Sequence, residues 1–247
     1  MSRRPTARGN RRGALGGGFF PPSAIAGCVA FWDATRGLVL SGANVTTAAD
    51  QAPGGTADTA TGASGLEPQF VASDGGGPCF DFATGRYFSL THSADFDFGA
   101  AFTVTGWIKR VSAGGNHHIF TQSLGATERL RMGPLSDNNF YALSDGTAGN
   151  VNCGYGTGLG WRHFAVTYDG GLAASSRLAI YLDGTAQAVT VSAAFPATMS
   201  AVNKDRIGLL AFNDSNPFNS KMAWLGIWNR ALTAAEVVAA KNYQPRA

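Results

Sequence analysis

Only three glutamates occur in the 247 residues of this chain, and none of them has a second acidic residue two or three positions away. Enzymes that cleave glycosidic bonds ordinarily place two carboxyl groups about 5–9 Å apart, one on each side of the bond. Glu67, Glu128 and Glu236 cannot supply such a pair from alternate positions of one strand. The sequence therefore argues against a glycoside hydrolase, and we expect a protein without enzymatic activity.

The histidines do not form a pattern that binds zinc. His117 and His118 are adjacent, and adjacent residues of a strand point to opposite faces of the sheet, so the two rings do not converge on one ion. His92 and His163 stand alone, and no ligand-spaced cluster of cysteine and histidine exists. We therefore expect each histidine to lie at the surface or at a sheet edge.

The cysteine count is odd, with Cys28, Cys79 and Cys153. In a chain without a secretory signal, this count favours free and mostly buried thiols. Cys28 and Cys79 both lie in segments with strand character, so a disulfide between them stays open as an alternative.

Calcium is the one cofactor for which the sequence offers candidate ligands. Carboxylate and amide oxygens at loop tips suit this ion, and they occur at Asp214, Asn216 and Asp145. The same residue types are ordinary turn formers, and no loop is densely acidic, so turn chemistry is the favoured interpretation. No other cofactor is indicated.

A glycan-binding site would need an exposed aromatic platform, and two tryptophans are candidates for it. If Leu225 and Ile227 face the core of a strand at 221–228, then Trp224 and Trp228 share the opposite face. An exposed apolar patch of this kind indicates a ligand or a partner. The alternative is that the chain's own helix or N-terminal arm covers the patch.

A second and weaker platform is predicted in the loop at 152–160. There Tyr155 supplies an aromatic ring, and Asn152 supplies an amide that could bind a sugar hydroxyl.

Most of the chain has the pattern of short strands separated by turns. Large apolar and polar residues alternate at 161–168, which is typical of a strand with one buried face. Asp183-Gly184 is a strong tight-turn signal, because glycine tolerates positive φ. The predicted strands are at 28–32, 78–82, 87–90, 102–108, 118–121, 129–132, 140–143, 161–168, 178–182, 205–210 and 221–228.

The only clear helix signal lies near the C-terminus. Thr233 and Glu236 form a capping box, in which the hydroxyl and the carboxylate each bind a backbone N–H of the first turn. This pattern predicts a short structural helix over 234–242.

The basic residues are concentrated in an N-terminal arm, residues 1–24. The formal net charge is +3, but the chain beyond the first 12 residues has 14 basic residues against 16 acidic ones, a net charge of −2. We expect the arm to dock onto a protein partner, with a solvated and unstructured arm as the alternative. The residues expected to anchor it are Arg3, Arg4, Arg8, Arg11, Arg12, Phe19 and Phe20.

No segment has the length and apolar character of a membrane span, and the N-terminus does not read as a secretory signal. We therefore predict synthesis in a cytoplasm, no membrane insertion, and one globular domain over residues 25–247.

With these elements placed, the chain resembles the concanavalin A-like jelly rolls of the laminin G type. The residues that carry the resemblance are 28–33, 78–82, 87–88, 102–108, 161–170, 178–184 and 226–233, together with Glu236. The resemblance implies an all-β fold, a two-sheet antiparallel jelly-roll sandwich with an extended N-terminal arm and a short C-terminal helix. This fold occurs in enzymes, lectins and structural modules, and some relatives bind calcium at loop tips.

Similar layouts occur in bacteriophage virion proteins and bacterial surface proteins. By this analogy we expect a non-enzymatic structural and adhesion protein of a virion, docked by its arm onto capsid or tail subunits. We expect it to form a homo-oligomer and to display the jelly roll toward host glycans. An outward decoration need not touch a packaged genome, so nucleic acid is not an expected partner. The alternatives are a free-standing lectin-like module on a bacterial surface and, third, a glycoside hydrolase.

Overall fold

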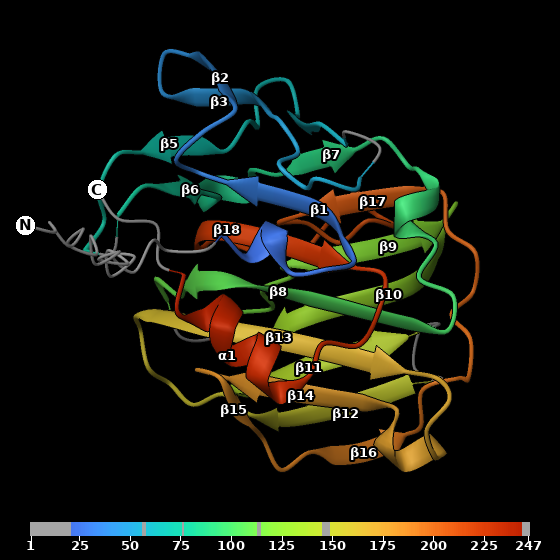
Figure 1. Ribbon diagram of the computed structural model, residues 1–247. Helices are drawn as coiled ribbons and strands as arrows, with labels where there is room; N and C mark the ends of the chain where they lie inside the picture. Colours follow the sequence, from blue (N-terminus) through green and yellow to red (C-terminus); the bar gives the residue numbers. More distant parts are fainter. Residues whose placement is uncertain (1–20, 56–57, 76, 113–114, 145–148, 244–247) are drawn as a thin grey trace, which may run out of the picture.

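The computed structural model describes residues 21–55, 58–75, 77–112, 115–144 and 149–243 of the chain. Within these residues, eighteen strands, one α-helix and four short 3₁₀ helices occur. The strands pair antiparallel and form two layers, one in front of the other in Figure 1. This confirms the predicted all-β sandwich.

The front layer is built around β8 (Ala101–Lys109), the central long strand. β8 pairs with β13 (Trp161–Asp169) on one side and with β18 (Lys221–Trp228) on the other. The layer is completed by β14 (Leu178–Leu182) and β15 (Thr185–Ala186) beyond β13, and by β1 (Cys28–Asp33) and β6 (Cys79–Asp81) along the free edge of β18.

The back layer follows a different order of the chain, because strands distant in sequence pair within it. In spatial order it contains β2 (Leu38–Ser41), β3 (Asn44–Ala48), β4 (Ala60–Gly62), β7 (Phe88–Leu90), β17 (Lys204–Ile207), β9 (Phe120–Leu124), β10 (Thr127–Pro134), β11 (Asn139–Ser144), β12 (Gly149–Gly154) and β16 (Thr190–Ala193). β5 (Gln69–Val71) pairs with both β3 and β6, so it joins the two layers.

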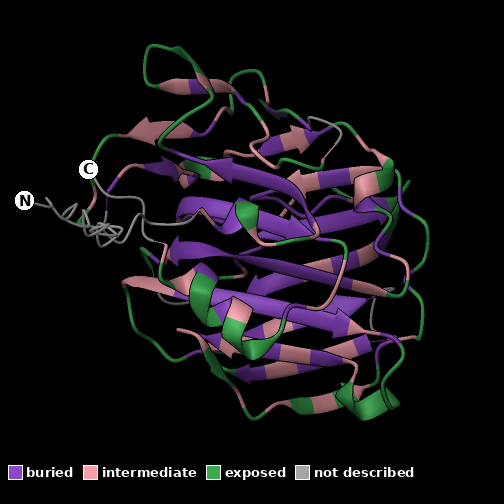
Figure 2. Cartoon of the chain, in the orientation of Figure 1, coloured by how far each residue is buried: buried purple, intermediate pink, exposed green. Residues whose placement is uncertain are grey.

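The main core lies between the two layers, where alternate residues of both point inward. Phe164 of β13 faces Phe140 of β11, and their ring centroids are 5.5 Å apart. Figure 2 shows buried residues concentrated along the central strands of both layers. Each fully buried large apolar side chain contributes about 1.5–3 kcal/mol to the free energy of folding, so this core supplies most of the stability.

A second apolar cluster covers the outer face of the front layer, beneath the helix α1 (Ala234–Lys241). The capping box predicted for this helix is present: Thr233 accepts from the backbone N–H of Glu236, whose carboxylate accepts from the backbone N–H of Thr233. Val237 and Ala240 are the buried residues of the helix. The short 3₁₀ helices are η1 (Pro22–Ala24), η2 (Ala83–Gly85), η3 (Ala94–Phe96) and η4 (Ala174–Ser176).

The expectation of an exposed tryptophan platform is wrong, although the predicted faces are right. Leu225 and Ile227 belong to the main core, and Trp224 and Trp228 point to the outer face. Both indoles are nevertheless fully buried. The physical reason is that the C-terminal segment returns over this face, so the chain's own helix provides the cover, as the alternative interpretation held.

The turn chemistry at 183–184 is confirmed. β13 pairs with β14 and β14 pairs with β15, and both turn residues have positive φ, 52° at Asp183 and 78° at Gly184. Each predicted strand segment contains a strand, and most bounds agree to within one residue. Three strands differ by two or more residues at an end: β9 begins at residue 120, β10 extends over 127–134, and β17 ends at residue 207.

The histidine expectation is wrong for three of the four residues. His117, His118 and His163 are buried, and only His92 is partly exposed. Burial lowers the pKa of His118 and His163 to about 3 in each case, so both rings are neutral polar groups of the interior. The three cysteines are buried and free, so Cys28 and Cys79 do not pair.

No helix of the described residues combines the length and the apolar character that crossing a membrane requires.

Candidate functional site

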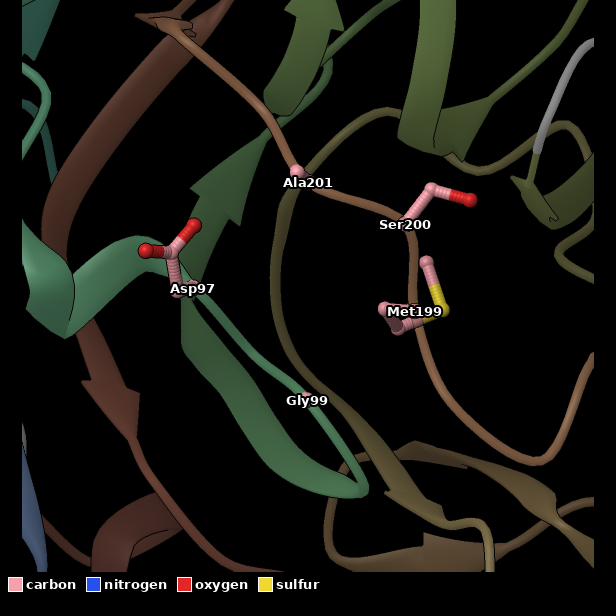
Figure 3. A pocket seen from close by; sticks show the side chains of 5 residues that line it. All are labelled: Asp97, Gly99, Met199, Ser200 and Ala201. Atoms are coloured by element: carbon pink, nitrogen blue, oxygen red, sulfur yellow. The ribbon is translucent and has the colours of Figure 1, made fainter.

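An open hollow of about 230 Å³ lies between two segments that connect strands. One segment precedes β8 and contributes Asp97 and Gly99. The other lies between β16 and β17 and contributes Met199, Ser200 and Ala201. Figure 3 shows the two segments facing each other, with the Asp97 carboxylate on one side and the Met199 and Ser200 side chains on the other.

The first segment is held in place by an alternation of apolar and acidic residues. Phe96 and Phe98 are buried in the main core, whereas the Asp97 side chain between them is 53% exposed. The Phe98 ring stacks on Phe102 of β8 with a centroid distance of 4.5 Å. Because the phenylalanines anchor the backbone, the carboxylate of Asp97 must point outward into the hollow.

The second segment is tied to the first by a backbone hydrogen bond. The N–H of Met199 donates to the carbonyl of Gly99 at 2.7 Å. Gly99 has φ of +51°, a left-handed conformation that glycine adopts without steric cost. The walls of the hollow are therefore fixed relative to each other by main-chain contacts.

His92 lies beside the hollow, between two carboxylates. Its Nδ1 is 2.9 Å from Oδ2 of Asp205, and its Nε2 is 3.5 Å from Oδ1 of Asp97. The imidazole is 23% exposed and Asp205 is fully buried. We refer to His92, Asp97 and Asp205 as the acidic triad. It connects the interior of the sandwich to the rim of the hollow.

Asp205 is a buried anchor for this arrangement. Its Oδ1 accepts a hydrogen bond of 2.8 Å from Nε2 of Gln122, and the same amide donates to the carbonyl of Phe96. Burial raises the pKa of Asp205, while the hydrogen bonds from Gln122 and His92 oppose this shift. Gln122 thus links the carboxylate that orients His92 to the helix η3 that positions Asp97.

The chemistry of the hollow suits binding of a small polar ligand. The Asp97 carboxylate accepts hydrogen bonds, the Ser200 hydroxyl both donates and accepts, and Met199 adds an apolar wall. Drug-sized ligands occupy pockets of about 300–1,000 Å³, so this smaller hollow matches a group the size of one sugar ring.

The structure does not bring the predicted glycan-binding residues to this place. Tyr155 is 3% exposed, and the guanidinium groups of Arg110 and Arg162 lie over its ring, with their central carbons 5.4 and 4.9 Å from the ring centroid. Burial raises the pKa of Tyr155 to about 12. Tyr155 therefore cannot act as an exposed platform. Asn152 lies in β12, opposite Tyr141 of β11, rather than in a loop.

The predicted calcium ligands are only partly described. Asp214 and Asn216 are exposed residues of one turn with positive φ. Oδ1 of Asp214 is 2.9 Å from Nζ of Lys204 and 3.6 Å from Nε of Arg206, so lysine and arginine already compensate its charge. Asp145 lies outside the described residues. In the described part of the chain, no group of three or more His, Cys, Asp or Glu could hold a metal ion. Calcium binding stays a prediction.

The residues of the predicted docking arm up to Phe20 also lie outside the described residues, so the structure adds nothing to that expectation.

Two of the three glutamates are held by arginines. Both carboxylate oxygens of Glu236 accept hydrogen bonds from Arg230, at 2.9 and 2.6 Å. Glu128 is 8% exposed, and its Oε1 is 3.2 Å from Nε of Arg131. Both carboxylates thus have structural partners.

Sequence reasoning missed the acidic triad. His92 and Asp205 are 113 positions apart, and nothing local marks them as partners. The one available signal was the alternation Asp95-Phe96-Asp97-Phe98, which places two carboxylates opposite two core phenylalanines.

Comparison with known proteins agrees with the fold. A family model described as the concanavalin A-like lectin/glucanases superfamily matches residues 82–238, more than half of the chain. No curated protein matches the sequence.

Three solved structures illustrate the similarity, which at these identities concerns the fold alone. Trypanosoma rangeli sialidase in complex with 2,3-difluoro-KDN has a TM-score of 0.61 and 14% identity, and the match covers 89% of this chain and 33% of the sialidase. A structure of botulinum neurotoxin type C, a toxin whose cell entry depends on interaction with two ganglioside molecules, has a TM-score of 0.63 and 11% identity. The match covers 87% of this chain and 51% of the toxin chain. The binding domain of botulinum neurotoxin DC in complex with SialylT has a TM-score of 0.62, 11% identity and the same coverage. This chain thus spans about a third to a half of these proteins.

Proposed function

Because the chain belongs to the concanavalin A-like lectin/glucanases superfamily, we propose that it is a non-enzymatic recognition module that binds a glycan at the hollow formed by residues 97–99 and 199–201. The observation that carries the proposal is the acidic triad at the rim of a hollow with fixed walls. The neurotoxin whose cell entry depends on two ganglioside molecules and the toxin binding domain in complex with SialylT share this fold, which supports a glycan as the class of ligand.

The carboxylates of Glu128, Glu236 and Asp205 have structural partners or are buried, and this favours a binding role over catalysis. Glu128 and Glu236 are paired with arginines, and Asp205 is fully buried. Among the residues that line the hollow, Asp97 is the only carboxylate. A second carboxyl group on the opposite side of a bound sugar, which glycosidic cleavage ordinarily needs, is not among these lining residues.

A place on a virion remains a further prediction, based on the basic arm and on analogy with phage proteins. It does not alter the proposed binding site. If the arm docks onto virion subunits, the full chain should be incorporated into particles. A truncated chain of residues 25–247 should not be incorporated.

The proposal is tested with the full chain on a broad glycan panel, followed by calorimetric titration of the glycans that bind. Asp97→Asn should weaken binding about tenfold or more, because a hydrogen bond to a charged group contributes about 1.5–3 kcal/mol and about 1.4 kcal/mol corresponds to a factor of ten.

The matched control is Asp95→Asn, which removes the same charge two residues away from a side chain that does not line the hollow. It should bind within about twofold of the natural protein, since surface substitutions outside the site have small effects. A flat response across the panel, or equal binding by Asp97→Asn and the natural protein, would refute the proposed site.

A further inference from the structure

The acidic triad has a net negative charge in every protonation state in which its two carboxylates are ionised. Two carboxylates carry −2, and an imidazolium at His92 contributes at most +1, so the net charge is −2 or −1. A proton moved from His92 to Asp205 leaves the same total. Asp97 is the only charged residue among those that line the hollow.

Two charged residues whose contacts involve neighbours of the triad, Asp58 and Lys204, already have partners. Ser93, next to His92, donates to Oδ2 of Asp58 at 3.0 Å. Lys204, which precedes Asp205, pairs with Asp214 on another turn. Asp97 is therefore the charged group that a ligand in the hollow meets.

We propose that the hollow selects a sugar that carries a protonated primary amine, a free hexosamine residue, over N-acetylated, neutral and carboxylated sugars. The inference rests on the proposed function and specifies its ligand class. The ammonium group donates up to three hydrogen bonds and carries a positive charge, so it complements Asp97 Oδ1 and the excess charge of the triad. Ser200 and Met199, which also line the hollow, then contact the ring of the sugar.

The same charge disfavours sialylated ligands at this hollow. A sialic acid carboxylate placed beside Asp97 would put two like charges together, which lowers affinity for that partner. This chain would therefore differ in its ligand from the sialidase in complex with 2,3-difluoro-KDN and from the toxin binding domain in complex with SialylT, although the fold is shared.

The experiment titrates the full-length protein with methyl glycosides of glucosamine, N-acetylglucosamine, glucose and N-acetylneuraminic acid. We expect the dissociation constant for the glucosaminide to be about tenfold lower than those for the glucoside and the N-acetyl derivative, with the sialoside weakest. In Asp97→Asn, the dissociation constants for the glucosaminide and the glucoside should lie within about twofold of each other. His92→Gln removes the one residue of the triad that can become positive, so this variant should keep or enlarge the preference.

Each other outcome separates the inference from the function on which it rests. Equal binding of amine and neutral glycosides, or tightest binding of the sialoside, overturns the inference and leaves glycan binding intact. Binding of none of the four glycosides, with a flat glycan panel, overturns both. A lysine derivative with blocked backbone groups that binds as tightly as the glucosaminide would show that the amine alone is recognised, which also overturns the assignment to an amino sugar. Loss of the amine preference in His92→Gln as well as in Asp97→Asn would show that the shape of the site, and not the net charge of the triad, sets the preference. That result would overturn the inference.

Discussion

The tryptophan face under α1 belongs to the front layer, and the hollow lies where the segment before β8 meets the segment before β17. The first surface is sealed and the second is open. At the sealed face, Trp107, Trp224 and Trp228 donate their indole N–H groups to the backbone carbonyls of Lys241, Tyr243 and Ile25. The last carbonyls of a helix have no partner within it, and Trp107 satisfies the one at Lys241, where α1 ends. Trp224 and Trp228 bind carbonyls of other segments that pack against this face. At the hollow, the Asp97 side chain is 53% exposed at the rim, although Oδ1 lies 3.5 Å from Nε2 of His92.

Both regions use a buried aspartate that contacts a ring from a distant part of the chain. Asp33 accepts a hydrogen bond from the hydroxyl of Tyr243, which helps to hold the C-terminal segment over the tryptophans. Asp205 bonds the His92 imidazole, which stays partly exposed. The contact of a buried aspartate with a distant ring thus helps to close the tryptophan face, and at the hollow it orients the His92 imidazole. Aromatic content alone does not identify a binding site in this protein.

The largest expected effect is on stability, at the sealed face. Trp224→Ala should lower the free energy of unfolding by about 3–5 kcal/mol, because it removes a fully buried aromatic side chain. Urea denaturation followed by circular dichroism measures this change. Val238→Ala, on the exposed side of the same helix, should stay within about 0.5 kcal/mol of the natural protein. Equal effects of the two substitutions would mean that α1 does not seal this face.

A smaller effect is expected within the acidic triad, where the buried and exposed aspartates should behave differently. Asp205→Ala leaves donors of Gln122 and His92 without their buried acceptor and should cost about 1–3 kcal/mol. Asp97→Ala removes only a partly exposed ion pair and should cost less than about 1 kcal/mol. Chemical denaturation of the two variants at pH 7 compares them. A larger loss of stability for Asp97→Ala than for Asp205→Ala would contradict the assignment of Asp205 as the anchor and Asp97 as the binding group.

The smallest effect concerns the cap of the helix that seals the tryptophan face. The hydrogen bonds from Arg230, assisted by those from Thr233, lower the pKa of Glu236 from 4.5 to about 2. The folded state therefore binds fewer protons than the unfolded state between these pH values, and the contribution of Glu236 is lost as pH falls from about 4.5 through about 2. Because the pair is about one-third exposed, Glu236→Gln should cost less than about 1 kcal/mol at pH 7.

This prediction is checked by urea denaturation of the natural protein and of Glu236→Gln at pH 7, 4 and 2.5. The difference between the two proteins should shrink as the pH is lowered. A difference that is independent of pH would show that the ion pair is not its source.

Local patterns predicted local structure well, because the interactions involved span only a few residues. The turn at Asp183-Gly184 and the cap at Thr233 were readable from adjacent positions. The assignment of Ile227 to the core and Trp228 to the opposite face followed from the strand period. The short strands β3 and β4 could not be placed individually, because their alanine- and threonine-containing segments have no strong apolar alternation.

The sequence by itself determined the fold class, the main strands, the capped helix and which side chains share a face of β18, since all of these depend on period and turn chemistry. Only the tertiary structure decided which face is covered and where polar groups meet. The tryptophans are buried because α1 returns across them from the C-terminal end of the chain. His92 meets Asp205 because β17, 113 positions later, pairs beside β7. Such contacts are set by the packing of distant strands, and no local pattern encodes them.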